Sequence, residues 1–543
     1  MSAQTSKITK HDGHSDTAGQ LSTPGTCAIS KLSTEILLII FSLNGHADAC
    51  YIDRDIGVDE ILHPIVPMAA LTTTRYSSQV CQQWRAILLD SPAIWATGLD
   101  LQCFDQQNDE WREEVLKRTG NRVLTIIGDL YENMPSVKFF LKLVSTEWSR
   151  IRRMFVCDRG GVSGFETEVW NALQQASPAL EWLHLDVSFE NIDLDLDLET
   201  PFFANNAPRL RGIQFDRIFM RPDQTWFQNL QHISDLDIAW FTIAELLLAL
   251  GHMPQLETLD LCGAAFHEDD NAEVNFSTVV LPRLNRLKAN CDLIIFTPVL
   301  RRLRTATNCS LHLSPIWDIP VGEDSQIEDL GKALSTFFQQ WTTEEIFSLS
   351  YVQVGASFSI HSPKWDVNTC VEINGSYEIL DWPGLPGLIL DALAEKSFST
   401  VILTIFLHFP PPAKSILSFL EKFPKLESIT CDLKTLDSLN NLMDSHDPER
   451  SILLPSMVQI YLLLGKQEDP NPLSNFLSLR QRLDVPIKYL VLCCGPSFTG
   501  NLQVFTALAR TFNLEIVLDS EKGGFMNTYI DLSFLAWLED HQL

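Results

Sequence analysis

The sequence predicts an α/β protein in which a small all-helical domain precedes an irregular solenoid of short parallel strands with helical return segments. Apolar residues recur at helical spacing within residues 30–98. Beyond residue 150 a different pattern repeats, in which an apolar residue is followed by x-x-apolar-x-apolar. Its period of about 20 to 30 residues is typical of solenoids, whose repeats stack to bury a shared core.

Length, composition and charge limit the functions that the protein can have. The 543 residues suffice for a small domain and an extended array. The formal charge of −29 disfavours nucleic-acid binding, because acidic surfaces repel phosphates. No uninterrupted apolar run is long enough to span a membrane, and residues 1–29 are polar and lack the apolar core of a secretory signal. We therefore expect a disordered tail over 1–29 and an intracellular protein, cytoplasmic or nuclear, without membrane contact.

Three helices are expected in the N-terminal domain. The first covers Thr34 to Leu43, and the preceding Ser33 can cap it. A short helix over Met68 to Tyr76 follows, and the third covers Val80 to Leu88 with one apolar face. Helices this short bury little surface alone, so the domain needs a partner or a neighbouring domain.

Three separated motifs in this domain resemble the F-box family. They are Leu32-Ser33-Thr34-Glu35-Ile36-Leu37, Val80-Cys81-Gln82-Gln83-Trp84-Arg85 and Ser91-Pro92-Ala93-Ile94-Trp95. The family pattern is Leu-Pro-x-Glu-Ile, then a Val-Cys-x-x-Trp-Arg helix, then Leu-Trp or Ile-Trp, so the motifs occur in the family's order. Two departures are the serine in place of proline and an inserted acidic loop over 44–67. Serine still caps a helix and long surface insertions cost little stability, so the resemblance stands.

The resemblance to the F-box family implies a non-catalytic substrate-recognition subunit of an SCF-type (Skp–cullin–F-box) E3 ubiquitin ligase. Members of that family bind a Skp-type adaptor, which links them to a cullin scaffold, and hold a target protein for ubiquitination. Carried over by position, the adaptor-binding residues are Leu32, Ile36, Leu37, Ile40, Val80, Cys81, Trp84 and Trp95. The alternative is a repeat scaffold with no ligase role, in which the helical domain only caps the array.

The apolar repeat is clearest in two runs. The early run contains Ile151/Met154/Val156, Leu180/Leu183/Leu185, Leu210/Ile213/Phe215, Ile233/Leu236/Ile238, Leu256/Leu259/Leu261 and Leu284/Leu287/Ala289. The late run contains Val401/Leu403, Leu426/Ile429/Cys431, Met457/Ile460/Leu462 and Ile487/Leu490/Leu492. A proline precedes many units at nearly one phase, as at Pro178, Pro208, Pro254, Pro282, Pro424, Pro455 and Pro486. The pattern resembles irregular leucine-rich repeats that lack the asparagine ladder of that family.

We expect the leucine-rich-repeat-like solenoid to cover 99–520 and a C-terminal cap to cover 521–543. Helical return segments are visible at Trp170 to Ala176, Ile243 to Gly251 and Lys414 to Phe423. The stretch 305–397 has the weakest pattern. It either continues the array or forms a separate small α/β domain.

No cluster of residues predicts an active site, a metal site or a cofactor site. Asp193, Asp195 and Asp197 alternate with leucines, but a calcium loop needs glycine at its sixth position and an acid at its twelfth, where Leu198 and Ala204 stand. The 12 cysteines are scattered without a Cys-x-x-Cys pair, so reduced thiols are expected. We therefore expect a protein that is not an enzyme and has no cofactor.

Tryptophans offer candidates for contact with the target protein, because exposed tryptophan is a frequent anchor of protein–protein binding. We select Trp226, Trp240 and Trp317 for this role. These residues do not specify which protein the target is.

Overall fold

The structure is a computed structural model of the whole chain. It describes residues 28–45, 70–105, 108–159, 165–186, 201–215, 221–263, 266, 277–307, 309–313, 324–340, 346–352, 357–362, 369–374, 384–395, 398, 401–407, 413–445, 452–464, 469–494 and 502–519. The expected N-terminal tail up to residue 27, the acidic loop from residue 46 and the C-terminal cap lie outside these residues.

Among the described residues, four α-helices form an N-terminal helical block, the part of the chain that precedes the first strand. They are α1 (Thr34–Gly45), α3 (Ala70–Val80), α4 (Gln82–Leu89) and α5 (Pro92–Ala96). The expectation that Val80 starts a helix is wrong, because Val80 ends α3 and Cys81 separates it from α4. Cys81 has extended backbone, with φ −157° and ψ 168°, and its Sγ accepts a hydrogen bond from the backbone N–H of Trp84. The thiol therefore caps α4, a role usually taken by serine or aspartate.

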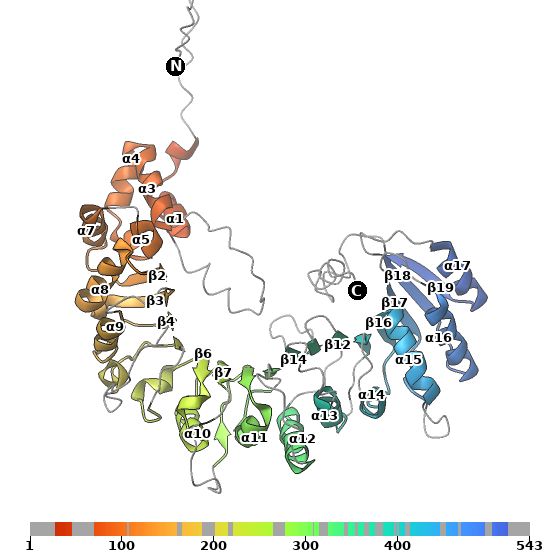
Figure 1. Cartoon of the computed structure of the whole chain (residues 1–543). Coiled ribbons are helices and arrows are strands. Elements are labelled where there is room, and N and C mark those ends of the chain that lie inside the picture. The colour runs from red at the N-terminus through yellow and green to blue at the C-terminus, as the bar shows by residue number, and fades with distance from the viewer. Residues whose placement is uncertain are drawn as a thin grey trace, which may run out of the picture.

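Within the described residues, seventeen strands join into one sheet. They are β1 (Leu99–Asp100), β2 (Leu124–Leu130), β3 (Ile151–Asp158), β4 (Trp182–Asp186), β5 (Gly212–Phe215), β6 (His232–Asp237), β7 (Thr258–Gly263), β9 (Arg286–Cys291), β11 (Ser310–Leu313), β12 (Ile346–Val352), β13 (Ser357–Ser362), β14 (Thr369–Asn374), β15 (Ile402–Leu407), β16 (Ser428–Asp432), β17 (Gln459–Leu464), β18 (Tyr489–Cys494) and β19 (Glu515–Asp519). The strands line the inner side of a long arc, which we call the concave face, and the helices lie along its outer side (Figure 1).

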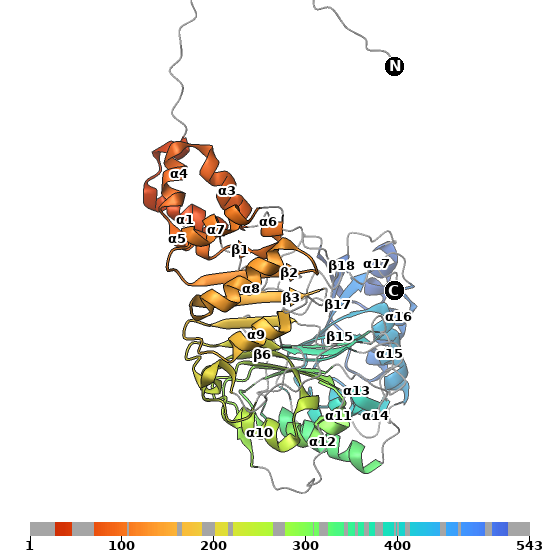
Figure 2. The same ribbon diagram turned by 60° about the vertical axis from the view of Figure 1, so that its left-hand side comes forward.

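Most return segments on the outer side are helical. The helices are α6 (Leu101–Asp105), α7 (Asp109–Arg118), α8 (Pro135–Glu147), α9 (Phe165–Leu173), α10 (Ile243–Gly251), α11 (Leu293–Arg302), α12 (Asp324–Phe338), α13 (Gly384–Leu393), α14 (Ala413–Leu420), α15 (Leu433–Ser445), α16 (Asn471–Arg482) and α17 (Leu502–Thr511). Figure 2 shows these helices packed along one face of the sheet. A main hydrophobic core fills the space between them and the strands. The coarse fold prediction, parallel strands with helical returns in a repeat array, is confirmed.

A tight turn precedes many of the strands and explains most of the prolines. The backbone N–H of Leu180 donates to the Ser177 carbonyl at 3.3 Å, and Pro178 takes the second position of that turn. The same turn, each with proline in second position, ends at Leu210, Leu256, Leu284, Leu426 and Met457. Proline suits this position because its ring fixes φ near the value that the turn needs. The turn therefore sets the phase of the strand that follows.

The residue after each turn links neighbouring repeats. Arg211 N–H donates to the carbonyl of Glu181 at 2.8 Å, and Val458 N–H donates to that of Glu427 at the same distance. The strands then align the apolar positions as the pattern predicts, for example in the series Met154, Leu183, Ile213 and in the series Ile429, Ile460, Leu490.

One repeat has a different phase from the prediction. The sequence pattern assigns Ile233, Leu236 and Ile238 to it, but Ile233 pairs with Leu259 and Leu236 pairs with Leu261, so the unit begins at Leu230. An extra residue is accommodated between Ile233 and Leu236, where Asp235 has φ 54° and the pairing register shifts. The turn that ends at Leu230 has no proline, so the signal that marks the other units is missing.

The weak stretch 305–397 continues the same sheet, and the alternative of a separate domain is wrong. β14 pairs in parallel with β11, and β12 pairs in parallel with β15. β13 lies between β12 and β14 and is antiparallel to both. The chain therefore folds back on itself here before the regular repeats resume, which the apolar pattern does not reveal.

Candidate docking surfaces

Helix α1 has an inner face that holds the helical block together. Leu37 and Phe41 are buried on this face, in a small cluster with Leu88 and Ile94. The ring of Trp84 packs edge-on against that of Phe41, with 5.0 Å between the ring centroids. These contacts join α1, α4 and α5 without help from the solenoid.

The outer face of α1 is apolar as well, but it is exposed. Ile36, Ile39, Ile40 and Leu43 are 45%, 57%, 38% and 70% exposed. Their spacing of three and four residues places them in one stripe along the helix. Exposed apolar stripes of this kind mark interaction surfaces, because their hydration is unfavourable.

A second exposed apolar site lies where α3 meets α4. Val80 is 63% exposed and Tyr76, one turn earlier on α3, is 55% exposed. Cys81 is exposed beside Val80. Because α1 packs against both α3 and α4, this site and the α1 stripe belong to the same small block.

The predicted adaptor-binding residues separate into three groups. Ile36, Ile40, Val80 and Cys81 are exposed, and Leu32 and Trp84 are partly buried against the block's own cluster. Leu37 and Trp95 are buried, so the expectation that they contact an adaptor directly is wrong. Ile39 and Leu43 were not predicted, because the run from Ile36 to Phe41 is apolar throughout and does not reveal which side of α1 faces outward. Tyr76, on α3, was not predicted either.

Trp95 connects the helical block to the main core. Its ring is fully buried in that core, and its indole N–H donates to the carbonyl of Leu88 at 2.8 Å. The guanidinium of Arg118, on α7, lies 4.6 Å from the centroid of the Trp95 ring, close enough for a cation–π contact. The block is thus attached to the first repeats by side chains from both parts.

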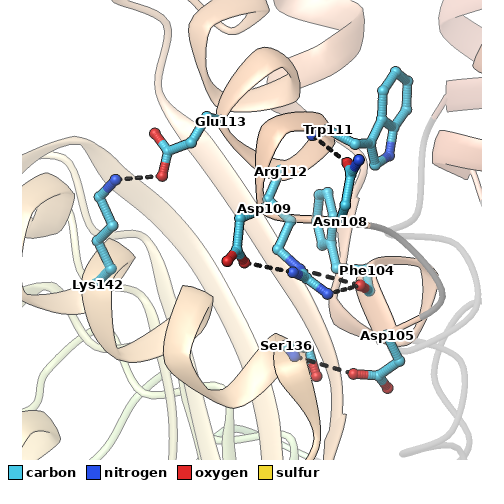
Figure 3. Close-up of polar contacts among 9 residues, drawn as sticks. All are labelled: Phe104, Asp105, Asn108, Asp109, Trp111, Arg112, Glu113, Ser136 and Lys142. Carbon is cyan, nitrogen blue, oxygen red and sulfur yellow. Dashed lines mark hydrogen bonds and ion pairs between the residues drawn. The ribbon is translucent and has the colours of Figure 1, made fainter.

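A set of polar contacts holds α6, α7 and α8, the first helices of the solenoid, against one another (Figure 3). The buried guanidinium of Arg112 on α7 donates twice to the carbonyl of Phe104, and it also pairs with Asp109 at 2.7 Å. The Asp105 carboxylate accepts a hydrogen bond from the backbone N–H of Ser136 at 3.1 Å, and so caps α8 from a neighbouring helix. Glu113 and Lys142 form an ion pair between α7 and α8.

The concave face carries an aromatic stack between β4 and β6. The rings of Trp182 and His232 lie 5.0 Å apart, with 22° between their planes. Gly212 on β5 lies between them in register with both. A Cβ atom at Gly212 would lie 2.1 Å from the Trp182 ring, so only glycine permits the stack. His232 Nδ1 shares a hydrogen bond with Thr258 on β7 at 3.0 Å.

Charged groups lie beside this stack. The Asp260 carboxylate on β7 pairs with Lys288 on β9 at 3.0 Å. Burial raises the pKa of Asp260 to about 6, and Lys288 offsets only part of that effect. Burial alone would lower the pKa of Lys288, but Asp260 outweighs it and that pKa is raised. Asp260 is the more deeply buried partner, so the loss of its hydration outweighs the attraction of Lys288.

We call the region from β4 to β9 the central concave face.

The tryptophans selected from the sequence for target binding do not form this surface. Trp226 is fully buried against Phe203 and Phe227, so the expectation that it binds a target is wrong. Trp240 packs partly buried against the main core, with its indole nitrogen buried. Trp317 lies outside the described residues, as do Asp193 to Asp197. Trp182 could have been selected from the sequence, because it lies between the repeat leucines Leu180 and Leu183. Gly212 and His232 take the same position in the next two repeats.

Among the described residues no group of three or more His, Cys, Asp or Glu side chains could hold a metal ion. None of the described helices combines the length and apolar character needed to cross a lipid bilayer.

Comparisons with known proteins do not show a family for this chain. No model of a known protein family matches the chain, and no similar curated protein is found. Among solved structures, the leucine-rich repeat-containing protein LegL7 from Legionella pneumophila matches over 71% of this chain and 97% of its own, at 11% identity and a TM-score of 0.28. A likeness this weak carries no argument, and the architecture rests on the strand pairing described above.

Proposed function

We propose that the chain is the substrate-recognition subunit of an SCF-type E3 ubiquitin ligase. The helical block binds a Skp-type adaptor, the adaptor connects to a cullin scaffold, and the concave face binds the target protein. The chain itself performs no chemistry in this proposal. The observation that carries it is the exposed apolar stripe on α1, formed by Ile36, Ile39, Ile40 and Leu43.

The stripe supports adaptor binding because the block does not need it to fold. Leu37 and Phe41 already supply the inner contacts of α1. Burying a large aliphatic side chain contributes roughly 1.5–3 kcal/mol, so a partner that covers several of these four residues gains much from the hydrophobic effect. The order of the motifs resembles that of the F-box family, and this resemblance indicates a Skp-type adaptor as the partner.

The attachment of the helical block to the solenoid supports the other part of the proposal, that the chain holds a target protein near the ligase. Trp95, buried in the main core beside Arg118 of α7, fixes the block to the first repeats. A rigid link would hold a bound target at a constant distance from the ubiquitin-loaded enzyme, which raises the effective concentration of target lysines. We assign the target to the central concave face, where Trp182 and His232 offer an aromatic surface.

The test is co-expression of the full chain with a Skp-type adaptor, followed by size-exclusion chromatography and a titration. We expect the wild type to co-elute with the adaptor. The double variant Ile39→Glu, Val80→Glu should lose at least about 30-fold in affinity, since two charges would replace exposed apolar contacts of hot-spot size. Leu32 and Trp84 are unsuitable for substitution because both also pack in the block's own cluster.

A matched control comes from the solenoid. Leu248 on α10 is 53% exposed, so Leu248→Glu makes the same kind of change far from the block. It should bind the adaptor like the wild type. A wild type that elutes alone, or a double variant that binds normally, would favour the alternative of a repeat scaffold whose helical block only caps the array.

A further inference from the structure

Trp111 on α7 contacts two helices of the helical block at once. Its ring meets that of Trp95 on α5 edge-on, with 6.4 Å between the ring centroids. The guanidinium of Arg75 on α3 lies 5.3 Å from the centroid of the same ring. The Trp111 ring points away from Glu113 and Lys142 (Figure 3). Helix α7 therefore contacts α8 on one side and the block on another.

A second guanidinium lies against the Trp111 ring. Arg118, two turns later on α7, is 5.6 Å from the ring centroid. Glu114 pairs with Arg118 at 3.0 Å, which offsets the repulsion between Arg118 and Arg75. The face of an indole ring attracts cations, so two arginines can share one tryptophan here.

The start of α3 gives the block a further attachment to the solenoid. Ala70 packs against Ile127 of β2 and Phe155 of β3, in a cluster separate from the main core. The Thr72 Oγ1 atom lies 3.3 Å from the Sγ atom of Cys103 on α6, within hydrogen-bond range. These contacts fix the position of the first turn of α3.

The block is thus attached at the start of α3, at Arg75 and at Trp95. Arg75 follows Thr72 by about 4.5 Å along the helix axis, and Trp95 lies on a different helix. A body held at three such places has a fixed orientation, whereas a body held only at the start of α3 could pivot. Trp111 takes part in two of the three attachments, because both Arg75 and Trp95 contact it.

We propose that Trp111 is the positioning residue that sets the orientation of the helical block on the solenoid. Helix α3 also carries Tyr76 and Val80, the exposed residues of the proposed adaptor site. Val80 is about 15 Å along the helix from Ala70. The direction of α3 therefore decides where that site lies relative to the central concave face. Its consequence for an adaptor rests on the proposed function, but the orientation itself is a property of the free chain.

The test measures the distance between the block and the solenoid in the full chain. Ketone-bearing amino acids that carry spin labels replace Gln83 on α4 and Lys138 on α8, both of which are exposed. Pulsed electron paramagnetic resonance should then give one narrow distribution of distances. Trp111→Leu should widen this distribution at least twofold, because leucine offers no ring face to Arg75. Trp111→Phe keeps a ring and should restore most of the original width.

Matched controls come from both parts of the chain. Trp170 on α9 is also partly buried against the main core, edge-on to Phe202, so Trp170→Leu should leave the width unchanged. Arg75→Gln removes the cation at a half-buried position and should widen the distribution even if Trp111→Leu does not fold. Arg85→Gln, at an exposed position on α4, should have no effect.

Three results would overturn the positioning role. They are an unchanged width in Trp111→Leu and Arg75→Gln, equal widening in Trp111→Leu and Trp170→Leu, and a Trp111→Phe variant as wide as Trp111→Leu. The first would mean that other contacts hold the block, the second that the whole solenoid has loosened, and the third that the ring face is irrelevant.

A titration with a Skp-type adaptor separates this role from the proposed function. The affinity of Trp111→Leu should stay within twofold of the wild type, because the α1 stripe and Val80 are intact. If the chain bound no adaptor but Trp111→Leu still widened the distribution, the proposed function would fail and the positioning role would stand.

Discussion

The early and late repeats share one backbone plan but differ in what they place on the concave face. The strands β4 and β7 read Trp-Leu-His-Leu-Asp and Thr-Leu-Asp-Leu-Cys-Gly, with polar and apolar residues in alternation. The strands β15 and β18 read Ile-Leu-Thr-Ile-Phe-Leu and Tyr-Leu-Val-Leu-Cys-Cys, which are almost continuously apolar. Parallel strands have such continuously apolar sequences when both of their faces are covered.

The difference shows that the repeat backbone and the concave face are specified separately. Turns, ladder bonds and core leucines are the same in both halves. The residues between the core positions decide whether a repeat keeps an open polar surface or an apolar one that must be covered. The early half therefore suits binding of a partner, and the late half suits a permanent contact.

The largest effect that separates the halves is expected from Arg480 on α16. Its fully buried guanidinium donates to the carbonyls of Leu453, Leu454 and Met457 at 2.8–3.1 Å, and burial lowers its pKa to about 10. Arg480→Ala would leave these carbonyls buried without their donor and should cost about 3 kcal/mol. Amide exchange should show lost protection in β17 and β18 but not in β4 and β5.

Arg482 provides the control for that experiment. It is on the same helix, largely exposed, and 4.0 Å from Asp444. Arg482→Ala should change protection by less than about 0.5 kcal/mol, as is usual for surface ion pairs. Loss of protection across all repeats in Arg480→Ala would mean that the two halves unfold as one unit and are not energetically separate.

A smaller effect, confined to the early half, is expected at Gly212. Gly212→Ala would push the Trp182 ring off His232, and overpacking of this kind costs about 1–3 kcal/mol. Gly251, at the end of α10, has no atom within 4 Å of the position of a Cβ, so Gly251→Ala should be neutral or stabilising by up to about 1 kcal/mol. Thermal unfolding of the two variants checks the difference. Equal stability would show that the stack has room to adjust.

Much of the fold could be predicted because local signals repeat. The helix over Ile243–Gly251 has the predicted bounds, and its start has a capping box formed by Thr242 and Glu245. The proline turns fixed the phase of most strands. The unit at Leu230 was misplaced because its turn has no proline, and the reversal at β12 to β14 was missed because strand direction leaves no mark on apolar spacing.

The candidate sites could be predicted only in part. The order of motifs pointed to the helical block, but both Leu37 and its neighbour Ile36 are apolar, and only packing distinguishes the buried one from the exposed one. The stack on the concave face joins Trp182, Gly212 and His232 from three repeats of unequal length. Their proximity depends on strand register, which the sequence specifies only after every turn has been placed correctly.

The smallest expected effect tests whether the polar central concave face lowers stability. Burial raises the pKa of Asp260 from its ordinary value to about 6, so folding favours the protonated acid. This contribution to stability is fully present below about pH 4 and is lost as the pH rises through 6. Asp260→Asn should therefore be more stable than the wild type at pH 7.5, by about 1–2 kcal/mol, and the difference should vanish near pH 4. Thermal unfolding at several pH values measures it. A variant less stable at pH 7.5 would show that the pair with Lys288 contributes more than burial costs, and the polar face would then stabilise the early half.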